Sequence, residues 1–114
     1  MHEASVAASL IEIVVETAKN NNAKKVRKAF VKIGKLAAVE TGSLLFAYDA
    51  IKEDFPLAAE SELIVDEVPI TGRCRECGAE NTYDEMYFAC SSCGSFEVDL
   101  LTGEELTITE IEVD

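Results

Sequence analysis

The stretch CRECGAENTYDEMYFACSSCG, residues 74–94, decides how this chain is organised. It holds all four cysteines of the protein as two Cys-X-X-Cys pairs that are separated by twelve residues. The two thiolates of one pair can reach a single cation, and two pairs complete the tetrahedron that Zn(II) prefers. The spacing therefore predicts a zinc site made of Cys74, Cys77, Cys90 and Cys93.

The residues beside these cysteines fit the same interpretation. Gly78 and Gly94 follow the second cysteine of each pair. Glycine adopts positive φ at little cost, so the backbone can turn there and direct its N–H groups toward the sulfur atoms. Arg73 and Arg75 flank the first cysteine. They either offset part of the charge of four thiolates or are ordinary surface residues.

Other uses of four cysteines are two disulfides, a redox-active pair, or an iron site of the rubredoxin type. A reducing cytoplasm disfavours disulfides, and a disulfide within Cys-X-X-Cys closes too small a loop to organise a module. Zinc with four protein ligands has no open position for a substrate, so we expect it to be structural. The sequence has no Ser/His/Asp set and no P-loop, so an enzyme is not expected.

The segments outside the module predict an α+β domain. An apolar stripe at helical spacing predicts a helix over residues 4–19, and β-branched residues predict a strand over 25–34. A second helix is expected over 41–55, with Thr41 or Ser43 as its cap and Pro56 at its end.

Two further strands complete the predicted sheet. One covers residues 61–70, where Pro69 marks an edge or an exit, and the other covers 105–113. The apolar positions of the last strand change face after Ile108, which predicts a bulge or twist. We therefore expect two helices packed on a three-stranded sheet, built from residues 1–70 and 104–114, with a four-cysteine, zinc-ribbon-like module inserted at 71–103.

Charge is distributed unevenly along the chain. The 114 residues carry a net charge of −12, and residues 76–114 contain eleven acids and no Lys or Arg. Such a segment repels nucleic acid and suits a cation or a basic protein surface, although acids also simply keep a surface soluble. No apolar run has the length of a membrane span, and no signal peptide is apparent, so a cytoplasmic location is expected.

The first three residues, Met1, His2 and Glu3, offer a second metal site. A retained Met1 would supply a terminal amine with a pKa of about 8, and His2 an imidazole and an amide nitrogen. Nitrogen ligands in a plane suit Ni(II) or Cu(II) better than Zn(II). The amide or carboxylate of Glu3 could be the fourth ligand. The alternative is an ordinary terminus with an incidental histidine and an acid at the start of a helix.

The chain resembles the HypA/HybF family of nickel metallochaperones over essentially its whole length. The start MHE, the segment KVRKAFVKIGKLAAVE, LLFAYDAI, the paired cysteines and ELTITEIEV carry the resemblance. It implies a nickel domain that binds Ni(II) through His2 and the backbone around Glu3, and zinc at the four cysteines. Ser91 stands where many relatives have Pro, and no other histidine is present to share nickel.

The resemblance also implies partners and a role. The function expected is delivery of nickel during [NiFe]-hydrogenase maturation, with the nickel-handling GTPase HypB and the hydrogenase large-subunit precursor as partners. Relatives carry an acid equivalent to Glu40, which either contributes near nickel or is a loop residue. The topology also allows domain exchange in a homodimer. The alternative function is a zinc-ribbon interaction module for RNA or a transcription complex.

Overall fold

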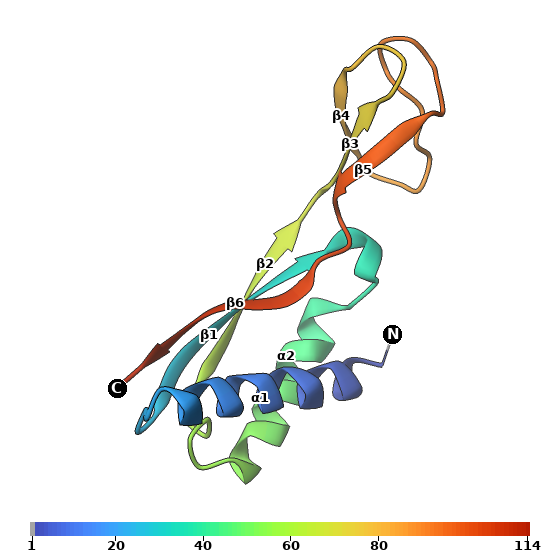
Figure 1. The fold of residues 1–114 in the computed structure, drawn as a ribbon. Coiled ribbons are helices and arrows are strands. Elements are labelled where there is room, and N and C mark those ends of the chain that lie inside the picture. Colours follow the sequence, from blue (N-terminus) through green and yellow to red (C-terminus); the bar gives the residue numbers. More distant parts are fainter. Residues whose placement is uncertain (1) are drawn as a thin grey trace.

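The computed structural model describes residues 2–114 and shows two three-stranded sheets in an elongated body of 54 × 26 × 15 Å. One sheet carries the two helices at one end of the molecule, and the other carries the cysteines at the opposite end (Figure 1). The predicted α+β fold, with two helices on a three-stranded sheet, is confirmed. The limits assigned to the two domains stay a prediction.

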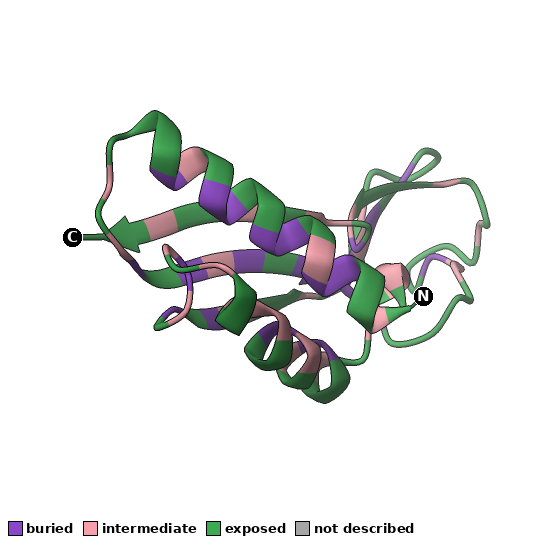
Figure 2. Ribbon diagram, turned by 90° about the horizontal axis from the view of Figure 1, so that it is seen from below, coloured by how far each residue is buried: buried purple, intermediate pink, exposed green. Residues whose placement is uncertain are grey.

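Helix α1 (Glu3–Asn20) packs on the sheet through one face. The buried stripe faces the strands in Figure 2, and the opposite face is exposed. Asn22 follows the helix with φ +54°, a left-handed conformation that asparagine tolerates. The buried side chains recur every three or four residues, as an amphipathic helix requires: Val6, Ala7, Leu10, Ile11, Val14, Val15 and Ala18.

Helix α2 (Thr41–Ile51) is shorter than predicted and continues as the 3-10 helix η2 (Lys52–Asp54). Phe55 is extended, as expected for a residue before proline. The predicted cap was wrong, because the N-cap is Glu40, whose carboxylate accepts hydrogen bonds from the N–H groups of Gly42 and Ser43. A carboxylate there also meets the positive end of the helix dipole.

The larger sheet has β1 (Val26–Gly34) at its centre. Strand β2 (Glu62–Val68) pairs with it in parallel and β6 (Leu106–Val113) pairs antiparallel. Phe30 lies opposite Glu110 and Val31 lies opposite Ile108, so one extra residue bulges out of β6. The irregularity predicted after Ile108 is confirmed.

The smaller sheet has β3 (Ile70–Cys74) at its centre, between the antiparallel strands β4 (Glu80–Tyr83) and β5 (Val98–Thr102). Only Pro69 separates β2 from β3, so this proline marks the exit from the first sheet, as the sequence indicated. The chain thus passes from one sheet to the other along β2–β3 and returns along β5–β6 (Figure 1).

A close backbone contact joins the two halves. The Gly34 N–H donates to the Glu105 carbonyl, and the Leu36 N–H donates to the Gly103 carbonyl, each at 2.8 Å. Leu36 belongs to the 3-10 helix η1 (Lys35–Ala37), directly after β1. A Cβ atom on Gly34 would lie 2.0 Å from the Gly103 carbonyl oxygen, so only glycine fits there.

Candidate metal centres

The four cysteines predicted as zinc ligands lie together at the far end of the smaller sheet. Their Sγ atoms all lie within 4.8 Å of one another, and the four thiols are free of disulfides. Two contacts join the pairs, Cys74 to Cys93 at 3.6 Å and Cys77 to Cys90 at 3.5 Å. Two sulfurs on one tetrahedral zinc are about 3.8 Å apart, because each Zn–S bond is about 2.3 Å long. The donor set and its spacing therefore fit zinc.

The two Cys-X-X-Cys turns have matching backbone geometry. Gly78 and Gly94 both have φ +77°, which confirms the role predicted for glycine. Backbone N–H groups within each turn point at the buried sulfur, from Cys77 to Cys74 and from Ser92 to Cys90. The N–H groups of Cys93 and Ser92 lower the pKa of the Cys90 thiol to about 6. The Cys77 N–H likewise lowers the pKa of Cys74, so each turn stabilises its buried sulfur as a thiolate, the form that binds metal. Hydrogen bonds to neighbouring thiols leave the pKa values of Cys77 and Cys93 raised.

Asn81 on β4 holds the second turn in place. Its side-chain carbonyl accepts from the N–H of Ser91 at 3.2 Å and from the Ser91 hydroxyl. Its amide lies 3.7 Å from Cys90 Sγ and 3.5 Å from the Ala79 carbonyl, with the geometry of a donor to both. Sequence reasoning missed this residue, because one asparagine between two cysteine pairs has no distinctive spacing.

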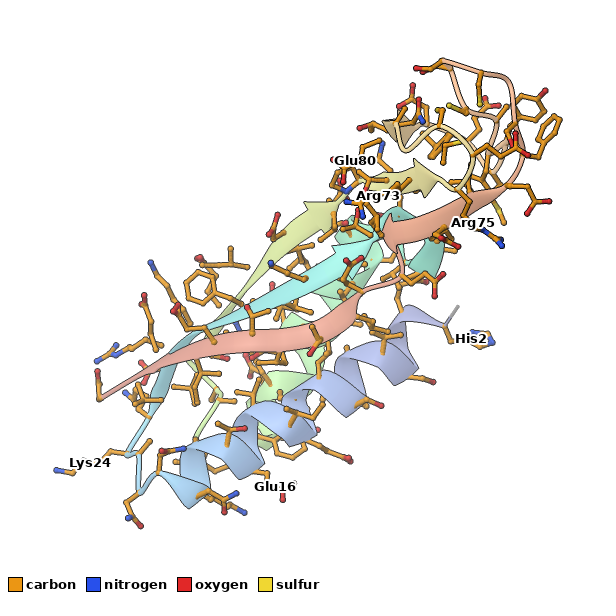
Figure 3. The ribbon with its side chains drawn as sticks, turned by 45° about the horizontal axis from the view of Figure 1, so that its top comes forward. His2, Glu16, Lys24, Arg73, Arg75 and Glu80 are labelled. Atoms are coloured by element: carbon orange, nitrogen blue, oxygen red, sulfur yellow. The ribbon has the colours of Figure 1, made fainter. Side chains whose placement is uncertain are left out.

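The two arginines beside the first cysteine are surface residues paired with acids. Arg73 contacts Glu80 at 2.9 Å, and Arg75 contacts Glu97 and Asp99 at 3.5 and 3.1 Å. Figure 3 shows Arg73 beside Glu80. Of the two roles that the sequence left open, the surface role is the one supported.

Tyr83, Tyr87 and Phe88 lie between the cysteine pairs, where the sequence predicts the small core of the module or, as the alternative, a surface that faces a partner. Tyr83 is buried and packs edge-to-face on Phe88 at 5.3 Å. Tyr87 is instead 67 % exposed and packs on Phe96, which is 66 % exposed. The core prediction therefore holds for Tyr83 and is wrong for Tyr87, whose ring lies at the surface.

Of the three residues predicted to bind nickel, Met1 lies outside the described residues. His2 is exposed and extended immediately before α1, and its side chain projects away from the body of the protein (Figure 3). Its carbonyl accepts the first helical hydrogen bond, from Val6 N–H at 3.1 Å. The N–H groups before Val6 have no carbonyl in the helix to bind.

Glu3 connects this terminus to the second helix. Its Oε2 atom accepts a hydrogen bond from the Glu40 N–H at 3.2 Å. This bond holds the pKa of the Glu3 carboxyl below its usual value. The Glu40 carboxylate is occupied as the cap of α2, so Glu40 is a structural residue in this state.

The whole chain matches one protein family. The family model described as hydrogenase/urease nickel incorporation, metallochaperone, hypA matches residues 1–113. This chain belongs to the HypA family. The HypA family consists of metallochaperones rather than catalytic enzymes, and the resemblance seen in the sequence is confirmed.

Curated members of the HypA family match the chain from end to end. The hydrogenase maturation factor HypA of Chlorobaculum tepidum is 37% identical over 114 residues, covering 100% of both chains. The protein of the same description from Nostoc punctiforme is 39% identical over 114 residues, covering 100% of this chain and 96% of the relative.

Solved HypA structures share the fold. The solution structure of the Ni metallochaperone HypA from Helicobacter pylori aligns with TM-score 0.71 and 27% identity, over 99% of this chain and 97% of that one. A second solution structure of HypA protein aligns with TM-score 0.74 and 26% identity, over 99% and 96% of the two chains. In residues 2–114, no helix is long and apolar enough to cross a membrane.

Proposed function

We propose that this HypA family member binds Ni(II) at its N-terminus and delivers it during [NiFe]-hydrogenase maturation. The observation that carries the proposal is the position of His2, exposed directly before a helix whose first N–H groups lack helical partners. Deprotonating an amide nitrogen there breaks no helical hydrogen bond. The ligands proposed are the Met1 amine, the His2 amide and imidazole, and a fourth from Glu3.

Nitrogen ligation in a plane gives the site its preference for Ni(II) over Zn(II). The engagement of Glu3 Oε2 with the Glu40 N–H favours the Glu3 backbone nitrogen over its carboxylate as the fourth ligand. Because His2 is exposed, its imidazole is accessible to protons and to the ligands of a partner. Protonation weakens metal binding, so either event would release the nickel.

Zinc at Cys74, Cys77, Cys90 and Cys93 is proposed to be structural. Four protein sulfurs fill the coordination sphere, so zinc bound there would hold the two turns together and have no position for a substrate. The free thiols suit a reducing compartment, which supports action in the cytoplasm.

The partners proposed are the nickel-handling GTPase HypB and the hydrogenase large-subunit precursor, since the family is one of nickel incorporation into hydrogenase or urease. A homodimer stays a prediction. The competing function, a zinc-ribbon module that binds nucleic acid, is opposed by the absence of any Lys or Arg after Arg75. Tight binding to RNA or DNA at physiological salt would overturn this choice.

The terminal-amine ligand is tested by acetylating the Met1 amine and titrating with Ni(II). We expect the affinity to fall and the square-planar absorption spectrum to change, because the nitrogen of an acetylated terminus is an amide and no longer an amine ligand. An unchanged affinity and spectrum would reject the amine as a ligand.

A second variant separates the two metals. His2→Ala should lose nickel and retain zinc, because the cluster proposed to hold zinc consists of the four cysteines and does not include His2. Nickel and zinc are counted per chain by metal analysis. Loss of both metals together would indicate that they share one site.

A further inference from the structure

The cysteine-bearing half of the molecule exposes an unusual amount of apolar surface. Five of the eight large apolar side chains that are exposed in the described residues lie between positions 86 and 101. Contiguous exposed apolar surface marks interaction sites in soluble proteins, and two of these side chains, Met86 and Leu100, line the same hollow. The five are Met86, Tyr87, Phe96, Leu100 and Leu101.

Part of this surface forms a groove at the junction of the two halves. A hollow of about 390 Å³ lies between η1, the loop before Cys90 and strand β5. A second hollow of about 360 Å³ continues it along β5, and the two share Leu100 and Glu104. The first hollow has an apolar floor with one acid at its edge: Leu36, Ala37, Met86, Phe88, Leu100 and Glu104.

Most of the charged residues around this groove are acidic, and the exposed Lys35, directly before Leu36 in η1, is the basic one on the other side. Glu104 lines both hollows, Glu105 lines the second, and the exposed acid Glu85 directly precedes Met86. Arg75, the last basic residue of the sequence, is already paired with Glu97 and Asp99. An apolar floor whose border is acidic on the side of Glu85 and Glu104 is complementary to a segment that carries both apolar and basic side chains.

We infer that this groove is the docking site for a basic amphipathic segment of a partner protein. Apolar side chains of that segment enter the hollow beside Met86 and Leu100, and its Lys or Arg side chains face Glu85 and Glu104. The negative charge of residues 76–114 opposes a nucleic acid or an anionic membrane in the same place.

The groove adjoins the segment between η1 and α2, which contacts the first turn of α1 through Glu40 and Glu3. Leu36 and Ala37 in its floor lie a few residues before Glu40, whose N–H binds Glu3. A segment docked there therefore lies against the connection that supports the proposed nickel site. The inference goes beyond nickel binding and stands without it, because only the zinc-loaded, nickel-free protein is needed to test it.

The test uses the full chain loaded with zinc and two fluorescent synthetic peptides with the same helical repeat of leucines. One peptide has Lys at its polar positions and the other has Glu. We expect the Lys peptide to bind with an affinity that falls as salt rises, and the Glu peptide not to bind. In ¹⁵N-labelled protein, the shifts on binding should map to Leu36, Met86 and Leu100.

Substitutions in the groove test whether the Lys peptide binds there. Met86→Ser and Leu100→Ser should each lower the affinity of the protein for the Lys peptide by at least about tenfold. Phe46→Ser is the matched control, because Phe46 is as exposed as Met86, at 79% against 77%, and belongs to α2. Zinc content and unfolding temperature confirm that each variant is folded.

Three outcomes would overturn the inference. They are equal binding of the two peptides, equal loss in all three variants, and self-association of the protein that Met86→Ser abolishes. The last result would assign the groove to a second copy of this chain. Failure of nickel binding in a separate titration would leave the groove result unaffected, so the two proposals fail independently.

Discussion

The Glu3 carboxylate accepts a hydrogen bond from the N–H of Glu40, the residue that caps α2, at 3.2 Å. This contact links the first turn of α1 to the first turn of the other helix across 37 positions of sequence. The residue beside the proposed nickel ligand His2 is therefore held by tertiary structure. An acid at this position does more than stabilise the start of its own helix.

This contact should make part of the stability depend on pH. The hydrogen bond lowers the folded pKa of Glu3, so its contribution is present above the ordinary carboxyl pKa of about 4.3 and is lost as pH falls through the lower folded value. Glu3→Gln should therefore reduce the unfolding temperature at neutral pH and have less effect at pH values below the folded pKa. Thermal unfolding at both pH values measures this.

The exposed acid Glu12 on the same helix provides the control. Glu12→Gln removes the same charge without the contact to α2. An equal, pH-independent effect of both substitutions would show that the Glu3 contact contributes nothing specific.

Gly34 should tolerate no side chain. Gly34→Ala places a Cβ atom 2.0 Å from the Gly103 carbonyl oxygen, where backbone on both sides must move. We expect a loss of about 3 kcal/mol in the free energy of unfolding, the upper end of the usual cost of overpacking. Urea unfolding measures the loss.

Gly42→Ala is the matched substitution. The new Cβ atom would lie 3.2 Å from a carboxylate oxygen of Glu40, which has to shift only slightly within its cap, and alanine favours the helix. It should be nearly neutral. Equal losses for the two variants would contradict a special role for the junction.

A buried polar pair closes the core beneath α2. The hydroxyl groups of Tyr48 and Ser61 are 2.7 Å apart, and Ser61 also donates to the Ala58 carbonyl at 2.6 Å. Ser61→Ala leaves the Tyr48 hydroxyl buried without its partner, at a cost of about 1–3 kcal/mol. Tyr48→Phe leaves the Ser61–Ala58 bond in place and should cost less.

The double variant Tyr48→Phe/Ser61→Ala measures the coupling between the two hydroxyl groups. Its loss in the free energy of unfolding should be smaller than the two single losses added together, because no hydroxyl remains buried without a partner. Additive losses would reject the pairing.

Asn81 should contribute to zinc affinity without being a ligand. Asn81→Leu removes the acceptor for Ser91 and the amide beside Cys90, so zinc affinity should fall by about 10–100-fold. Competition with a chelator measures the affinity, and the spectrum of bound Co(II) should keep its tetrahedral, four-sulfur character. Thr82→Val, at the next and exposed position of β4, is the control.

The main elements of this protein were predictable because they depend on local patterns. Seven apolar residues at helical spacing specify α1, and the change of face after Ile108 specifies the bulge in β6. The spacing of the two cysteine pairs predicts that the four sulfur atoms come together, because each pair occupies one tight turn closed by glycine. These signals lie within a few residues, where spacing and backbone preference are enough.

Tertiary structure decided which polar groups meet. Glu40, and not Thr41, caps the helix, and the Thr41 hydroxyl donates a hydrogen bond to Glu67 on β2. Asn81 reached Ser91 because β4 and the second turn are brought together by the cysteines. Hydrogen bonds between distant residues depend on strand register and on the angle between elements. Neither the register nor the angle can be predicted from the spacing of residues along the chain. The cysteine pairs and the apolar stripe of a helix, in contrast, can be predicted from spacing alone.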